Sequence, residues 1–273
     1  MGNQTLFIGV AGPRAKHVEV LAKYYSKLME QRKGDEPRPY LFIGLQTSRK
    51  SLNGESENPI YADRMNTRKE ILEACEIAKL FPETKIIVHY NPSGDYSAPE
   101  VAEQVHWLAE SPIDGLQWNG FSSEYSPKTD PKFEQHFGPA GVLAWKEFSI
   151  LQITNTDFHN PELFALRISW ITKHYSHLLF DPSCGLGKSL EEDEDTAINW
   201  AKVLLGKNLP KGLVFSGGLG PDEGGLDVIR RIRQATGNKA YFSFDAEGKL
   251  RDHNGFSIAK AESFLDKAIA CYR

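Results

Sequence analysis

The sequence has few cysteines and no paired cysteine motif. Its 273 residues include only Cys75, Cys184 and Cys271, and no CxxC pair, which argues against a zinc ribbon or a thioredoxin-type site. Such isolated thiols are typical of a reducing compartment, so we expect a cytoplasmic protein. No apolar run approaches the ~18 residues of a membrane helix, and the first residues lack the basic segment of a signal peptide. We therefore expect no membrane partner.

An excess of positive charge is also lacking. The chain has 32 Lys and Arg residues against 36 Asp and Glu residues, a net charge of −4. A sequence-independent nucleic-acid binder needs a basic face, so we expect no nucleic-acid partner. The chain contains no HExxH metal motif and no GxSxG hydrolase turn. We therefore predict neither a metal site nor a cofactor.

Eight short β-branched or aromatic runs alternate with stretches of helical period. The predicted strands span 5–11, 40–46, 85–91, 114–120, 148–154, 177–183, 212–218 and 240–246. The predicted helices span 17–31, 67–81, 99–111, 161–175, 195–206, 226–237 and 258–272. This alternation indicates parallel strands joined by crossover helices. Eight such units predict an α/β fold, a single (β/α)8 TIM barrel domain over residues 1–273.

An open, doubly wound sheet is the alternative fold. It would place a glycine-rich turn after the first strand and an acidic residue at the end of the second. The chain instead has VAGPRAKH (10–17) and LQTSRK (45–50) there, which favours the barrel. Two segments, 48–66 and 119–139, are longer than a barrel requires. Both follow strands on the side where barrel active sites are built, so we expect lids or specificity loops. Disorder is the alternative for the segment 48–66.

A glycine-rich turn follows the seventh predicted strand. Ser216, Gly217 and Gly218 belong to SGGLGP (216–221), which precedes a helix. Glycine lets backbone N–H groups converge on an anion, and a helix N-terminus behind the turn would add a favourable dipole. Because barrels commonly bind phosphate after this strand, we predict a phosphate site. A plain tight turn is the alternative.

A second glycine-rich loop, CGLGKS (184–189), follows the sixth predicted strand. It lacks the GxxxxGK[ST] spacing of a P-loop. We expect Gly185 and Gly187 to border the same pocket, with Lys188 as a neutralising charge. The alternative for Lys188 is an ordinary solvated lysine.

Taken together, these segments resemble phosphoribosylanthranilate isomerase, a ribulose-phosphate-binding barrel of tryptophan synthesis. The resemblance is carried by DGLQWNG (114–120), FDPSCGLGKS (180–189) and SGGLGPDEG (216–224), with TSRKS (47–51) after the second strand. Their order and spacing fit the family across most of the chain. The resemblance implies an Amadori-type rearrangement, in which a carboxylic acid protonates the sugar ring oxygen and a base removes a proton from the adjacent carbon.

Three residues take roles from this resemblance. Asp181 matches the general acid, which would need a pKa raised by partial burial; a helix cap or loop acceptor is its alternative. Arg49 matches the arginine that binds the substrate carboxylate, as a planar guanidinium can; a surface charge is its alternative. Asn119 stands where the family often has histidine, and we expect it to bind substrate.

The chain departs from the family at the first strand. GVAGPR (9–14) places Ala11 where the family has its cysteine base, and alanine cannot accept a proton. His89, at the end of the third strand, could replace that base because the unperturbed pKa of histidine is near 6.5. A structural histidine at a strand end is the alternative.

The eighth strand also departs from the family. In FDAEGKLRD (244–252), Asp245 and Glu247 would repel a phosphate unless they turn away. Gly248 could still offer its amide, and Lys249 or Arg251 could supply compensating charge.

These residues predict an isomerase-like enzyme that acts on a small phosphorylated metabolite. A non-catalytic or divergent phosphate-binding barrel, with the isomerase base removed, is the first alternative. A lyase or transferase that uses His89 or Asp181 is the second, because this fold hosts many reactions. The oligomeric state is open, and a homodimer is compatible with the sequence.

Overall fold

The computed structural model of the chain describes most of the predicted strands and helices. The described residues are 5–32, 36–59, 61–91, 99–118, 146–153, 175–182, 189–206, 212–238 and 240–272. The predicted helix 161–175 lies almost entirely outside them, and the long segment 119–139 lies wholly outside them. Among the described helices, none is long and apolar enough to cross a membrane.

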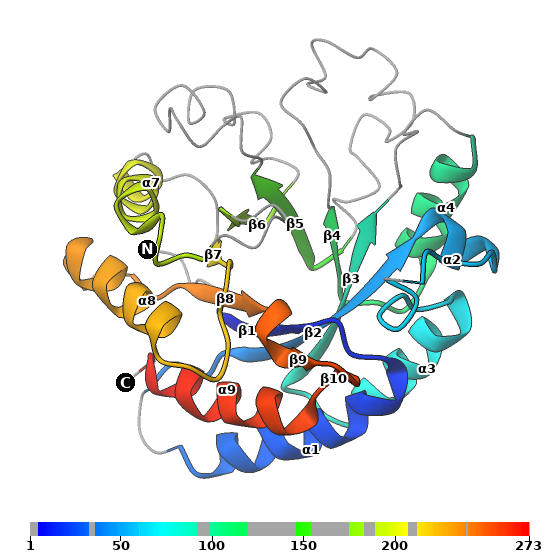
Figure 1. Ribbon diagram of the computed structural model, residues 1–273, viewed down its shortest axis with the longest axis horizontal. Coiled ribbons are helices and arrows are strands. Elements are labelled where there is room, and N and C mark those ends of the chain that lie inside the picture. Colours follow the sequence, from blue (N-terminus) through cyan, green and yellow to red (C-terminus); the bar gives the residue numbers. More distant parts are fainter. Residues whose placement is uncertain are drawn as a thin grey trace.

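Eight parallel strands close into a barrel in chain order (Figure 1). They are β1 (Phe7–Ala11), β2 (Tyr40–Ser48), β3 (Thr84–Asn91), β4 (Gly115–Trp118), β5 (Phe148–Ile153), β6 (His177–Phe180), β7 (Gly212–Phe215) and β8 (Ser243–Ala246). Closure is made where β8 pairs with β1, with Ile8 opposite Phe244. The predicted (β/α)8 fold is confirmed. β6 and β7 end earlier than predicted, because Pro182 lacks an N–H group and Gly217 has a φ of 98°.

The described helices lie on the outside of the barrel along part of its circumference (Figure 1). They are α1 (Ala15–Glu30), α2 (Arg49–Asn53), α3 (Arg68–Ala78), α4 (Pro99–Glu110), α7 (Glu194–Gly206), α8 (Gly224–Ala235) and α9 (Ile258–Ala270). Local capping explains where two of them begin. Thr67 and Glu70 form a capping box at the start of α3, and the Ser257 hydroxyl accepts from the Lys260 N–H at the start of α9.

Three small elements at the strand C-terminal side were not predicted. Helix α2 follows β2 directly and lies inside the segment predicted as a loop over 48–66. A single-turn 3-10 helix, η4 (Gly248–Leu250), follows β8, and β9 (Arg251–Asp252) then pairs with β10 (Gly255–Phe256) in a short hairpin. They are too short to produce a periodic pattern in the sequence.

Side chains along the strands alternate between two apolar layers. The layer inside the barrel contains Phe7, Phe42, Ile87, Phe148, Ile150, Leu179 and Val214. The layer between strands and helices includes Phe180, Phe215 and Phe244. Because successive strand residues point to opposite faces, the residues after these three phenylalanines point into the barrel. Those residues are Asp181, Ser216 and Asp245.

Candidate functional site at the barrel mouth

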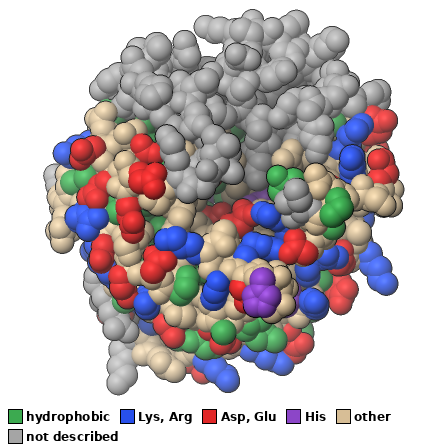
Figure 2. All heavy atoms as spheres, viewed as in Figure 1, with side chains coloured by type: hydrophobic (Ala, Val, Ile, Leu, Met, Phe, Trp, Pro, Cys, Tyr) green, Lys and Arg blue, Asp and Glu red, His purple; other side chains and the backbone are tan. Residues whose placement is uncertain are grey.

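Polar side chains replace apolar ones at the mouth of the barrel, which is the C-terminal end of β1–β8. The inward positions there are buried or half-buried, and they are Gln46, His89, Gln117, Gln152, Asp181, Ser216 and Asp245. Figure 2 shows the described surface hollowed near its centre, where acidic and basic side chains gather. Barrel enzymes build their active sites at this end, so this mouth is the candidate site.

Asp181 lies at the predicted place, directly after β6. Its side chain is half-buried, and Gln152 Nε2 of β5 donates to its Oδ2 at 3.0 Å. Ser216, the residue after β7, lies beside it, because the Ser216 N–H donates to the Phe180 carbonyl at 2.9 Å. The carboxyl group of Asp181 is therefore oriented by an amide at the level of the glycine-rich turn.

Asp245 is the residue whose role the sequence did not reveal. It is 9% exposed, and the space it fills is left by Gly9 of β1, where any β-carbon would overlap Asp245 Oδ1. Burial, with added repulsion from Glu247 and Asp181, raises the pKa of Asp245 well above its usual value. The mouth thus holds two carboxyl groups that interact electrostatically.

His89 points into the barrel between two small residues. A β-carbon on Gly44 would lie 2.6 Å from His89 Nε2 and 3.1 Å from the Ala11 β-carbon. Ala11 and Gly44 therefore leave the room that the imidazole occupies. Burial lowers the pKa of His89 to about 4, so the ring is neutral at neutral pH and is a weak base.

The glycine turn, residues 216–220, has two amide groups without an acceptor among the described residues. Gly217 and Gly218 have φ angles of 98° and 66°, a region that glycine adopts readily. The Gly217 carbonyl accepts from the Leu190 N–H at 2.9 Å. In the described part of the chain, no acceptor is found for the N–H groups of Gly217 and Gly218. These two donors remain available for an anion.

Lys249 of η4 lies across the glycine turn. Its Cε would be 3.8 Å from a β-carbon on Gly218, and its stem packs directly on Gly220. Lys249 Nζ pairs with Asp222 at 2.9 Å. Gly248 is exposed, with open space where a side chain would extend. The amides and one ammonium group thus lie on the same side of the mouth.

The helix behind the turn is already partnered by a carboxylate. Glu191 lies against the first residue of α8, because a β-carbon on Gly224 would overlap Glu191 Oε1. A carboxylate there satisfies the positive end of the helix dipole. An anion bound at this helix N-terminus would therefore compete with Glu191, and the predicted contribution of the helix stays a prediction.

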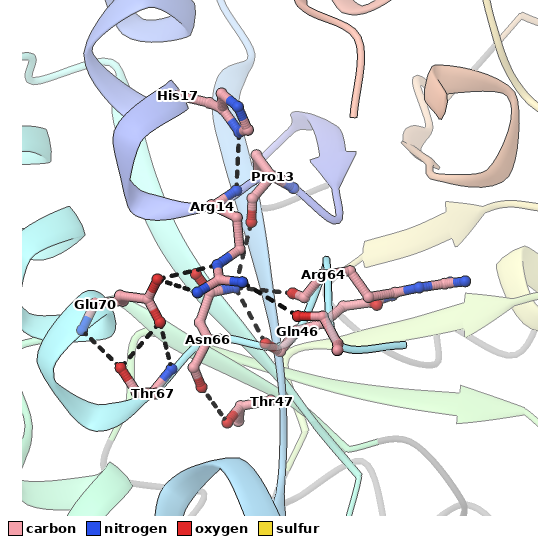
Figure 3. A network of polar contacts seen from close by, with 10 residues as sticks. Pro13, Arg14, His17, Gln46, Thr47, Arg64, Asn66, Thr67 and Glu70 are labelled. Atoms are coloured by element: carbon pink, nitrogen blue, oxygen red, sulfur yellow. Dashed lines mark hydrogen bonds and ion pairs between the residues drawn. The ribbon is translucent and has the colours of Figure 1, made fainter. Parts of the chain in front are cut away.

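An arginine from the β2–α3 connection reaches the opposite side of the mouth. Arg64 Nη1 pairs with Glu247 Oε1 at 2.8 Å. This ion pair offsets the negative charge of Glu247, which we expected to repel a phosphate. Figure 3 shows the backbone near Arg64 held by Asn66, whose Nδ2 donates to the carbonyls of Arg64 and Gln46, both at 3.1 Å. Arg251 donates to the carbonyl of Gly12, the residue after β1, at 3.2 Å and also pairs with Asp63.

Arg49 lies on the α4 side of β2. Its Nη1 is 4.0 Å from Glu100 Oε2, and its carbonyl accepts from Gln104 Nε2 at 3.0 Å. Gln104 also accepts from the hydroxyl of Tyr90, which belongs to the layer outside the barrel. The contacts of Arg49 are with α4 and do not include Asp181 or Asp245. Arg64 instead pairs with Glu247, two residues after Asp245.

Four other predicted site residues lie outside the described part of the chain. They are Asn119, Gly185, Gly187 and Lys188. Their predicted roles stay predictions. Among the described residues, no cluster of three or more His, Cys, Asp or Glu side chains could hold a metal ion.

Comparison with known proteins identifies the fold. No family profile and no curated protein sequence matches the chain. Among solved structures, a GH113 β-1,4-mannanase is 13% identical, with a TM-score of 0.53 and 99% of each chain covered. A GH18 chitinase catalytic domain from the fern Peteris ryukyuensis is 12% identical, with a TM-score of 0.54, covering 98% of this chain and 99% of its own.

A phosphoribosylanthranilate isomerase from Pyrococcus furiosus is also similar. It is 14% identical, with a TM-score of 0.49, and covers 96% of this chain and 98% of its own. Similarity at this level carries no argument about activity. The mannanase and the chitinase, with TM-scores above 0.5, show that the chain shares its fold with solved barrel structures.

Proposed function

We propose that this protein is an acid–base isomerase of a small phosphorylated sugar, with an active site at the barrel mouth. The observation that carries the proposal is the buried carboxyl group of Asp245, which interacts electrostatically with Asp181 two strands away. The glycine turn lies between them, and the N–H groups of Gly217 and Gly218 have no acceptor among the described residues. A group that exchanges protons and a group that binds anions are the two parts that such a reaction needs.

The phosphate end of the substrate would lie at the glycine turn. Ser216, Gly217 and Gly218 would offer donors, with Gly248 and Lys249 on the facing side. Gly185, Gly187 and Lys188, predicted from the sequence, would complete this wall. Asp222 pairs with Lys249 at 2.9 Å, so a bound phosphate would compete with that carboxylate for the ammonium group.

The reacting end of the substrate would face Asp181. The half-buried carboxyl of Asp181 is close enough to the surface of the mouth to meet a sugar ring, and Gln152 orients it. Arg64 is the arginine placed to meet a second anionic group, and it replaces Arg49 in this proposal. Asn119 keeps its predicted substrate-binding role, and His89 contributes a neutral wall.

The test is hydrogen exchange of candidate substrates in D2O. Phosphorylated aldoses and their 1-amino derivatives would be incubated with the protein, and loss of the C2 proton signal would be followed by NMR. We expect exchange with at least one compound, and its loss in Asp181→Asn. Binding of a sugar phosphate without any exchange would reject the enzyme and leave the alternative, a phosphate-binding barrel without catalysis.

That alternative has one specific observation in its favour. Ala11 stands at the strand-one position where the resembling family has its base. For the same reason, we expect phosphoribosylanthranilate isomerase activity itself to be weak or absent. Complementation of a tryptophan auxotroph that lacks this isomerase would contradict that expectation.

A further inference from the structure

We propose that Asp245 and Asp181 hold one proton between them and together carry out both proton transfers of the isomerisation. This inference rests on the proposed function and deepens it. Asp245 supplies the second proton-exchanging group of the site. It takes the acid role that the family resemblance implied for Asp181, and Asp181 takes the role of the base that Ala11 cannot fill.

Strand register places the two carboxyl groups on one wall. Phe180 pairs with Phe215, and Phe215 pairs with Phe244. The next residue on each of these strands therefore lies at the same height and points inward. Asp181 and Asp245 stand on either side of Ser216, the residue after β7.

The first strand is shaped to receive the second carboxyl group. Gly9 and Ala11 are the inward residues at the upper end of β1, and neither projects a side chain large enough to fill the mouth. The Asp245 side chain reaches across from the adjacent strand, where Gly9 is opposite it in the register. A proton-exchanging group thus reaches the wall of β1 from β8.

The charges around the pair favour one shared proton. Glu247, at the end of the same strand, and Asp181 both repel a negative charge on Asp245. Arg64 pairs with Glu247 at 2.8 Å, and Gln152 donates to Asp181 at 3.0 Å. Burial raises the pKa of Asp245, which favours its neutral form. The proton therefore resides on Asp245 in the resting state.

The two transfers balance without a co-reactant. Asp245 gives its proton to the sugar ring oxygen, and the electrons of the C1–O bond pass to that oxygen as the ring opens. Asp181 takes the C2 proton, and the electrons of the C2–H bond form the C1–C2 double bond of an enol or enolamine. The ketose forms when C1 takes a proton and the C2 hydroxyl releases one. The pair again holds one proton.

The test is infrared spectroscopy of carboxyl groups, with ¹³C-labelled aspartate, as a function of pH and without substrate. We expect the wild type to show a protonated aspartate at pH 7. That signal should disappear in Asp245→Asn, titrate at lower pH in Asp181→Asn, and persist in Asp266→Asn, a matched change at an exposed surface carboxylate. Absence of the signal in the wild type, or an unchanged titration in Asp181→Asn, would overturn the shared proton.

Activity separates this inference from the proposed function. Each of Asp181→Asn and Asp245→Asn should reduce C2 exchange at least 100-fold, and Asp266→Asn should not change it. If the shared proton is observed but no sugar phosphate exchanges its C2 proton, the proposed function is rejected and the shared proton of Asp181 and Asp245 is retained. If Asp245→Asn retains full exchange while Asp181→Asn loses it, the isomerase stands and the role of Asp245 is rejected.

Discussion

Gly9 of β1 and Asp245 of β8 occupy complementary positions inside the barrel. The two residues are opposite each other in the parallel register, and the carboxyl group of Asp245 fills the space that any side chain on Gly9 would need. A glycine on one strand thus permits an acid on the next. This relationship links the packing of the barrel to the chemistry at its mouth.

Substitution of Gly9 by alanine should displace the Asp245 carboxyl group. The added β-carbon overlaps Asp245 Oδ1, and overpacking of this kind costs about 1–3 kcal/mol of the free energy of unfolding. Urea unfolding would measure the loss. In an Asp245→Ala background the same change should cost much less, because the overlapping atoms are gone. An equal cost in both backgrounds would show that the two residues do not meet.

The Asp245→Asn variant should be more stable than the wild type at pH 7. The pKa of Asp245 is raised in the folded protein, whereas it is near 3.9 in the unfolded chain. As pH rises from the unfolded pKa through the folded pKa, the unfolded chain ionises first, and the wild type therefore loses stability. Each unit of raised pKa corresponds to about 1.4 kcal/mol. Unfolding free energies at pH 4 and pH 7 would reveal a gain in the variant only at the higher pH.

His89 should lower the free energy of unfolding as pH falls, whereas Asp245 lowers it as pH rises. The pKa of His89 is lowered to about 4 in the folded protein. The contribution of His89 to the free energy of unfolding is therefore complete above the unfolded pKa of 6.5. It is lost as pH falls through 4, because the unfolded chain binds the proton first. The full loss is about 3 kcal/mol. His89→Gln should show a smaller loss of unfolding free energy between pH 7 and pH 4. A loss as large as that of the wild type would contradict the buried neutral ring.

Gly218→Ala should weaken the binding of inorganic phosphate. The alanine strains a residue with a φ of 66° and places its β-carbon 3.1 Å from Ser189 Cβ. Titration calorimetry should show at least a ~10-fold loss of affinity, equal to ~1.4 kcal/mol.

Gly54→Ala is the matched control, because Gly54 has a φ of 75° with open space around its α-carbon. Each variant should lose about 1–2 kcal/mol of stability through backbone strain. Only Gly218→Ala should lose phosphate affinity, and equal effects on binding would remove the glycine turn from the site.

The sequence was sufficient to predict the barrel, because apolar periodicity is a local property. Each of the eight predicted strands was found, and so were the helices that fall within the described residues. Asp181 was found at the end of β6 for the same reason, since its position depends only on where one strand ends. Helix α2 escaped detection because a single turn contains no periodic pattern.

The sequence by itself determined which residues point into the barrel and which glycines could form an open turn. Only the tertiary structure decided which charges meet there. Arg64 pairs with Glu247, and Asn66 holds the backbone carbonyl of Arg64. Asp245 has a raised pKa because Gly9 leaves the space in which its carboxyl group is buried, near Glu247 and Asp181. Pairings of this kind join residues up to hundreds of positions apart, and electrostatic coupling depends on distance in space rather than along the chain.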